Sequence, residues 1–279
     1  MEAGEHIVLT MSEFELFYNR RRDGAFIPMS DFLKDKTAVI TGASRGLGKA
    51  MALALADAGV KLALVARDEA KLAEVAAAAR ERGVEAECYR VDVTSESDVL
   101  ALEVKVRERF GKAQILINNA GVNLRKPVTD FTYQEWRYVL DTNLTGAFLM
   151  CRSFVPHMKG SGYGRIINMT STMAHVSLPE RIAYSSSKAG LLGMTKALAL
   201  ELATEGVTVV GISPGPFATE MNAPLINDPV KNAQFLESIP VHRWGKVEDI
   251  GVLARYLCSE EASFITGTDI VIDGGWLAR

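Results

Sequence analysis

Cysteine and histidine are scarce in this chain, and neither occurs with metal-binding spacing. Cys88, Cys151 and Cys258 lie far apart without a Cys-x-x-Cys pair, which is typical of reduced thiols and not of a disulfide framework. The four histidines show no His-Glu-x-x-His arrangement. We therefore expect no metal site and a cytoplasmic location.

Long apolar runs and an excess of positive charge are also missing. No apolar stretch approaches the roughly 18 residues of a membrane span, and the N-terminus lacks the basic and then apolar layout of a signal peptide. The net charge of −3 argues against a nucleic acid or an anionic membrane as partner. This composition favours a small-molecule partner.

Short apolar runs alternate with helical patterns from Thr37 onward, which is typical of βαβ units and a parallel sheet covered on both faces. The expected strands are 37–41, 61–66, 86–91, 114–118, 165–169, 207–212 and 269–272. The first expected helix follows the first strand and ends at Gly59, and the next two span 68–83 and 94–110. A fourth begins with a capping box at Thr132 and runs through Asn143 toward Cys151. A fifth contains Tyr184 and Lys188, and a sixth spans 248–258. The prediction is one α/β domain with a doubly wound, seven-stranded parallel sheet over residues 31–279, preceded by an N-terminal extension of residues 1–30.

A glycine-rich turn, residues 41–48, lies where the first expected strand passes into a helix. At such a place glycines let a pyrophosphate approach the backbone N–H groups of a helix N-terminus, as in Rossmann-type sheets. The turn therefore predicts a dinucleotide site. Its expected contacts are Gly42, Ser44, Arg45, Gly46, Leu47 and Gly48.

The end of the second expected strand indicates which dinucleotide is bound. NAD-dependent enzymes place an acidic residue there to bind the ribose 2′-hydroxyl, but this chain has Ala66 followed by Arg67. The guanidinium groups of Arg45 and Arg67 suit a 2′-phosphate. We expect NADP(H) to be preferred, with NAD(H) possible. The alternative is that Arg67 pairs with Asp68 or Glu69 and that Arg45 is solvated.

Tyr184 and Lys188 form a Tyr-x-x-x-Lys pentapeptide, and Ser171 lies thirteen residues upstream of the tyrosine. On a helix, side chains at i and i+4 share one face, so an ammonium would lie beside a phenol. A cation about 4 Å away at an effective dielectric of about 20 contributes about 4 kcal/mol. Bringing the pKa of a tyrosine from about 10 toward neutrality requires a similar free energy. Taken alone, this short and common pattern favours a surface pair that shares a helix face, but the other motifs favour the catalytic interpretation.

From about Phe32 to Trp276 the chain resembles short-chain dehydrogenases/reductases of core length. The resemblance depends on the glycine turn, Asp92-Val93, Asn118-Asn119-Ala120-Gly121, Asn143, Ser171, Tyr184, Lys188, Pro214-Gly215 and Asp273-Gly274-Gly275. It implies that Tyr184 exchanges a proton with the substrate oxygen and that Lys188 lowers the pKa of Tyr184 and holds the nicotinamide ribose. Ser171 would bind the substrate oxygen, and Asn143 would anchor a water linked to Lys188.

The same resemblance implies further cofactor contacts. Asp92 and Val93 would flank the adenine. Asn119, Ala120 and Gly121 would contact the ribose side, while Pro214, Gly215 and Thr219 would hold the nicotinamide. It also implies a homotetramer, formed through apolar faces of the helices around Asn143 and Tyr184 that include Leu191, Leu192, Met194, Leu198 and Leu202.

The substrate is less well defined by the sequence. The candidate substrate residues are Asn123, Arg125, Met173 and His175, with a substrate loop over about 215–245. Segments 123–127, 216–221 and 243–245 resemble gluconate 5-dehydrogenase-like members, which implies a small polar keto or hydroxy substrate such as a sugar acid. Arg125 would bind its carboxylate, although a solvated Arg125, or one paired with Asp130 or with another subunit, stays open. The alternatives are a 3-oxoacyl-[acyl-carrier-protein] reductase and, in another class, a non-catalytic NADP(H)-binding sensor or structural protein.

Overall fold

A computed structural model describes residues 32–278, so the N-terminal extension of residues 1–30 lies outside the described part of the chain. Seven parallel strands form one sheet in the order β3-β2-β1-β4-β5-β6-β7. The strands are β1 (Thr37–Thr41), β2 (Lys61–Ala66), β3 (Ala86–Arg90), β4 (Ile115–Asn118), β5 (Gly164–Met169), β6 (Val207–Pro214) and β7 (Asp269–Ile272). This confirms the predicted doubly wound Rossmann-type fold.

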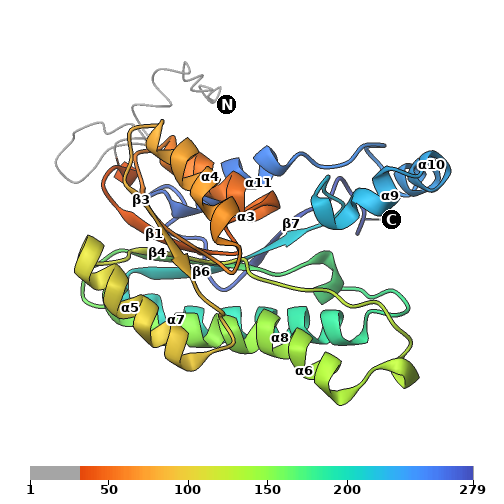
Figure 1. Cartoon of the computed structure of the whole chain (residues 1–279), viewed down its shortest axis with the longest axis horizontal. Helices are drawn as coiled ribbons and strands as arrows, with labels where there is room; N and C mark the ends of the chain where they lie inside the picture. Colours follow the sequence, from red (N-terminus) through yellow and green to blue (C-terminus); the bar gives the residue numbers. More distant parts are fainter. Residues whose placement is uncertain (1–31, 279) are drawn as a thin grey trace, which may run out of the picture.

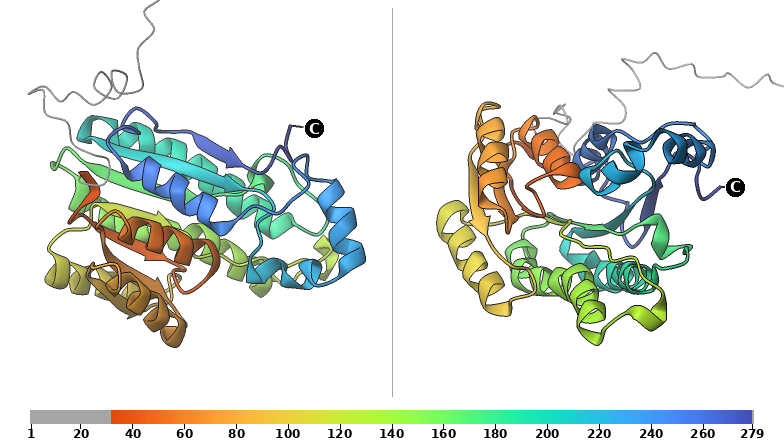
Figure 2. Two further views of the ribbon diagram at one scale, coloured as in Figure 1. Left: turned by 90° about the horizontal axis from the view of Figure 1, so that it is seen from above. Right: turned by 45° about the vertical axis from the view of Figure 1, so that its right-hand side comes forward.

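Helices cover both faces of the sheet (Figures 1 and 2). One face carries α3 (Gly46–Ala56), α4 (Glu69–Arg80) and α11 (Val247–Cys258), and the other carries α5 (Glu96–Phe110), α6 (Tyr133–Leu140), α7 (Gly146–Met158) and α8 (Ile182–Leu202). The short helices α9 (Ala223–Ile226) and α10 (Pro229–Glu237) lie beyond the carboxyl end of β6.

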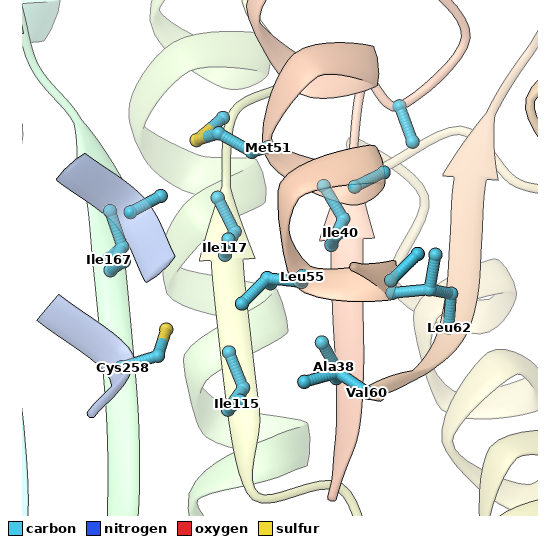
Figure 3. Close-up of a cluster of buried hydrophobic side chains, with 14 of the residues drawn as sticks. Ala38, Ile40, Met51, Leu55, Val60, Leu62, Ile115, Ile117, Ile167 and Cys258 are labelled. Carbon is cyan, nitrogen blue, oxygen red and sulfur yellow. The ribbon is translucent and has the colours of Figure 1, made fainter. Parts of the chain in front are cut away.

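The central strands are apolar on both faces because each face is covered by helices. Ala38 and Ile40 of β1 face the α3 side, while Val39 between them packs in the cluster on the opposite side. Met51 and Leu55 of α3 pack over β1 and β4 (Figure 3). Burying each such aliphatic side chain, rather than leaving it exposed to water, stabilises the fold by about 1.5–3 kcal/mol.

Side-chain caps start several helices where the sequence predicts them. Asp68 accepts from the backbone N–H of Lys71 at the start of α4, and Ser95 accepts from Asp98 at the start of α5. Thr132 and Glu135 form a reciprocal capping box at the start of α6. Each cap satisfies backbone donors that have no partner within the helix.

The helix expected to run from Thr132 toward Cys151 is interrupted. Residues Asp141–Thr145 form a π-helical turn between α6 and α7, in which the N–H of Gly146 donates to Asp141 O. Such turns accommodate an extra residue and are frequent at functional sites. The turn places the predicted catalytic Asn143 inside the protein, where 1% of its surface is exposed.

Candidate active site

A cavity of about 910 Å³ lies at the carboxyl edge of the sheet. Its lining includes most of the predicted site residues: Gly42, Ser44, Arg45, Gly46, Leu47, Arg67, Asp92, Val93, Asn119, Ala120, Gly121, Asn123, Arg125, Ser171, Met173, Tyr184, Lys188, Pro214, Gly215 and Thr219. They converge because every parallel strand ends at this edge. β1 lies between β2 and β4, so the strand order reverses there, and a crevice for ligands is expected at such a point.

The glycine turn is tied to the end of β4 by hydrogen bonds. Thr41 Oγ1 accepts from the backbone N–H groups of Asn119 at 2.9 Å and Ala120 at 3.0 Å. Asn119 Nδ2 returns two bonds of 3.0 Å to the carbonyls of Thr41 and Gly42. These bonds close the floor of the crevice between β1 and β4.

Gly48 does not line the cavity, but its lack of a side chain lets α3 pack closely against Gly42 and Asn119. A Cβ at this position would lie 2.2 Å from Gly42 O and 2.5 Å from Asn119 Nδ2. The contribution of Gly48 is therefore close packing of α3 on the glycine turn, which is one of the roles of glycine in dinucleotide-binding turns.

The N-terminus of α3 is the part of the cavity that fits a pyrophosphate. Its N-cap residue, Arg45, makes no side-chain capping bond, whereas α4, α5 and α6 are all capped by side chains. The first-turn N–H groups of α3 are thus left without a side-chain acceptor beside Gly42, Ser44 and Gly46 of the cavity lining. A phosphate supplies the missing acceptor and is favoured by the helix dipole.

Two arginines reach the end of the cavity expected to hold the adenosine. Arg45 donates to Glu220 Oε2 at 2.7 Å, and Lys71 Nζ lies 3.7 Å from the same oxygen. The neighbouring Tyr138 phenol raises the pKa of Arg67. Among residues 32–278, Arg67 forms no salt bridge with Asp68 or Glu69, so the alternative pairing considered above does not occur. Glu220 was not among the predicted site residues, because nothing in its local sequence links it to the glycine turn.

Ser171, Tyr184 and Lys188 meet deeper in the cavity. Tyr184 and Lys188 lie one turn apart on α8, with Lys188 Nζ 5.7 Å from the centroid of the Tyr184 ring. Lys188 Nζ donates to Met169 O at 2.5 Å. Ser171 follows the end of β5, and its side chain is near enough to the Tyr184 phenol to lower the pKa of that phenol.

Asn143 does not line the cavity but lies directly behind it. Its Nδ2 donates to Val122 O and to Ser187 Oγ, each at 2.9 Å, and its Oδ1 accepts from Val122 N at 2.8 Å. A Cβ at Gly121 would lie 3.2 Å from Asn143 Oδ1 and 3.7 Å from Lys188 Nζ. The absence of a side chain at Gly121 therefore leaves room between Asn143 and Lys188.

Burial is the largest cause of the pKa shifts of Tyr184 and Lys188. Burial raises the pKa of Tyr184, and the nearby Ser171 hydroxyl opposes this increase only in part. Burial lowers the pKa of Lys188 to about 8. The direction for Tyr184 differs from the expectation that Lys188 lowers it, because desolvation of the phenolate outweighs the other contributions in the protein alone. At neutral pH Tyr184 is therefore a protonated phenol.

The predicted substrate residues divide into two groups. Asn123, Arg125 and Met173 line the cavity, together with Arg181, whose pKa is lowered first by burial and then by the charge of Arg125. Within residues 32–278 neither arginine forms a salt bridge, so Arg125 is not paired with Asp130. His175 is not part of the lining, and its Nε2 lies 2.6 Å from Asp269 Oδ2.

Comparison with known proteins identifies related enzymes. A family model described as Enoyl-(Acyl carrier protein) reductase matches residues 42–277. The chain is 37% identical to a D-beta-hydroxybutyrate dehydrogenase of Rhizobium meliloti, over 88% of this chain and 99% of the relative. It is 36% identical to a 3-oxoacyl-[acyl-carrier-protein] reductase of Staphylococcus epidermidis, over 86% of this chain and 98% of the relative.

A solved structure extends these similarities. The chain resembles a gluconate 5-dehydrogenase from Burkholderia cenocepacia J2315, solved in complex with NADP and tartrate, with a TM-score of 0.84 and 31% identity over 90% of this chain and 100% of that one. In the described part of the chain, no helix is long and apolar enough to cross a membrane, and no group of three or more His, Cys, Asp or Glu residues could hold a metal. With its glycine turn, its Ser-Tyr-Lys site and these relatives, the chain belongs to the short-chain dehydrogenase/reductase family of oxidoreductases.

Proposed function

We propose that this enzyme interconverts a secondary alcohol and a ketone with NADP(H), using Asn143, Ser171, Tyr184 and Lys188. The observation that carries the proposal is that Ser171, Tyr184 and Lys188 line one cavity with the glycine turn. Bound NADP(H) would supply or accept the hydride. The chain itself must bind the carbonyl, transfer a proton to or from its oxygen and stabilise the charge that develops.

The protonated phenol of Tyr184 suits proton donation to a carbonyl oxygen. Ser171 would donate a hydrogen bond to the same oxygen, and the Lys188 ammonium would stabilise the phenolate that remains. The space beside Gly121 borders both Asn143 and Lys188, which supports the proposed water between them. The contacts of Asn143 with Val122 and Ser187 would hold its amide in place for that role.

The proposal predicts that Tyr184→Phe lowers turnover by about 10²–10⁴-fold, the range typical of a lost proton-transfer group, and leaves NADPH affinity nearly unchanged. NADPH oxidation would be followed with ketones, keto-sugar acids and acetoacetyl thioesters. Tyr133→Phe is the matched control, because Tyr133 lies exposed on α6 outside the cavity. Near-normal turnover by Tyr184→Phe would exclude the proposed mechanism.

A preference for NADP(H) is supported by Arg45 and Arg67 in the cavity and by the absence of an acidic residue at Ala66. The gluconate 5-dehydrogenase relative was solved with NADP. NAD(H) remains a usable cofactor in this proposal, because the contacts to the pyrophosphate and the nicotinamide do not depend on the 2′-phosphate.

Replacing Ala66 with Asp and Arg67 with Leu should shift the enzyme toward NAD(H). Losing one or two charge-assisted hydrogen bonds of about 1.5–3 kcal/mol each weakens NADP(H) binding about tenfold or more. Dissociation constants for NADPH and NADH can be measured by quenching of intrinsic fluorescence, with Arg107→Ala, an exposed arginine of α5, as control. Equal affinities of the unmutated enzyme for NADPH and NADH would contradict the preference.

For the substrate we propose a small keto or hydroxy acid of the sugar-acid type. Arg125 and Arg181 line the cavity with Tyr184, and both lack a carboxylate partner in residues 32–278, so they would together bind a substrate carboxylate. Met173 and Asn123 would complete this part of the pocket. The loop of about 215–245, which supplies Leu225, Phe235 and Trp244 to the lining, would close over the substrate. A 3-oxoacyl-[acyl-carrier-protein] reductase is the second candidate, favoured by the Staphylococcus relative.

Arg125→Ala and Arg181→Ala should each raise KM for an acidic keto-substrate about tenfold or more, equivalent to about 1.4 kcal/mol, and leave a neutral ketone almost unaffected. Arg107→Ala serves again as the surface control. Equal losses with the acidic and the neutral substrate would show that these arginines act on structure. A selective loss with acetoacetyl thioesters would favour the acyl-carrier substrate instead.

We also propose a homotetramer in the cytoplasm. Leu191 and Leu202, expected at a subunit interface, are buried in the monomer, but Phe148, Ile182 and Leu200 are exposed on α7 and α8. Leu200 is the clearest case, with 84% of its surface exposed. These exposed apolar side chains support association of subunits through the layer formed by α7 and α8. Sedimentation as a monomer at working concentrations would reject the proposed tetramer.

A further inference from the structure

The Asp269 carboxylate is a buried charge outside the cavity lining. Only 4% of its side chain is exposed, although it begins the edge strand β7. Three side chains surround its oxygens. Thr170 Oγ1 lies 2.5 Å from Oδ1, His175 Nε2 lies 2.6 Å from Oδ2, and Ser213 Oγ also donates to Oδ2. A buried carboxylate requires such hydrogen-bond donors, because they replace the water molecules that it loses on burial.

These partners connect Asp269 to both ends of the turn that carries Ser171. Thr170 immediately precedes Ser171, and His175 is the C-cap of the 3₁₀ turn Thr172–Ala174, for which Ser171 is the N-cap. Within the turn, Ser171 Oγ accepts from Met173 N at 3.1 Å. One carboxylate thus holds residues before and after the predicted catalytic serine.

The neighbouring strand is shaped to admit the carboxylate. A Cβ at Gly211 of β6 would lie 1.9 Å from Asp269 Oδ1, so only glycine leaves room for it. Glycine in the interior of a strand otherwise weakens it, and it often marks close approach of another group. Gly211 pairs directly with Asp269 in the parallel register.

We propose that Asp269, with His175, is a positioning residue that sets the location of Ser171 Oγ relative to Tyr184. The carboxylate does not line the cavity, so it acts through the residues it holds, which are Thr170 and His175 on either side of Ser171 and Ser213 of β6. This assigns to His175 a role different from substrate contact. The inference rests on the proposed role of Ser171 in the reaction.

The test is a double-mutant cycle between Asp269 and Ser171. Asp269→Ala in the otherwise unmutated enzyme should lower kcat about ten- to a hundredfold, since displacement of a reacting group by about 1 Å has effects of this size. KM for NADPH should stay within about twofold. In a Ser171→Ala background the same change should alter kcat less than about twofold, because the serine it positions is already absent.

His175 supplies a milder variant if Asp269→Ala does not fold. His175→Ala should lower kcat, and His175→Gln should restore most of it, because its amide can donate to Asp269 from a similar distance. Glu248→Gln, on the exposed start of α11, is the control for charge removal. Equal effects of Asp269→Ala or His175→Ala in the presence and absence of Ser171 would overturn the positioning role. No effect of Ser171→Ala alone would instead contradict the proposed function.

Discussion

Burial of the Lys188 amine is the constraint on which the active site depends. Only 4% of this residue is exposed, and its Nζ donates to Met169 O, with no carboxylate paired to it in residues 32–278. Burying an ammonium without a counter-charge costs several kcal/mol, and the lowered pKa of about 8 reflects that cost. At neutral pH most of the lysine is nevertheless charged, so the site holds a positive potential that suits a developing phenolate on Tyr184.

The surrounding structure holds the Lys188 ammonium close to the phenol of Tyr184. Helix α8 fixes Lys188 one turn from Tyr184, and the end of β5 brings Ser171 against the phenol. The π-helical turn carries Asn143 to a position behind Tyr184 and Lys188. Gly121, which has no side chain, leaves space between Asn143 and Lys188. Because the resting Tyr184 is protonated, it suits the proposed donation of a proton to a carbonyl oxygen, and the positive charge of an oxidised cofactor would favour its phenolate form.

Features determined by local chemistry were predictable from the sequence, whereas those set by distant contacts were not. The seven strands, to within two residues at each end, the caps at Asp68, Ser95 and Thr132, and the glycine turn followed from spacing and residue type. The π-helical turn did not, because it depends on Asn143 finding partners at Val122 and Ser187. The Arg45 to Glu220 pair spans 175 positions, and His175 pairs with a residue 94 positions away, so neither left a local signal.

The most direct test of the central claim is the pH dependence of NADPH-dependent ketone reduction. In the proposed mechanism the ammonium of Lys188 is the active form, so the rate should be level below about pH 8 and should fall as pH rises through the pKa of about 8. In Lys188→Arg the guanidinium stays charged, so the rate should be lower at every pH and its decline should move well above pH 8. A decline near pH 8 that persists unchanged in Lys188→Arg would show that another group controls the reaction and would contradict the account.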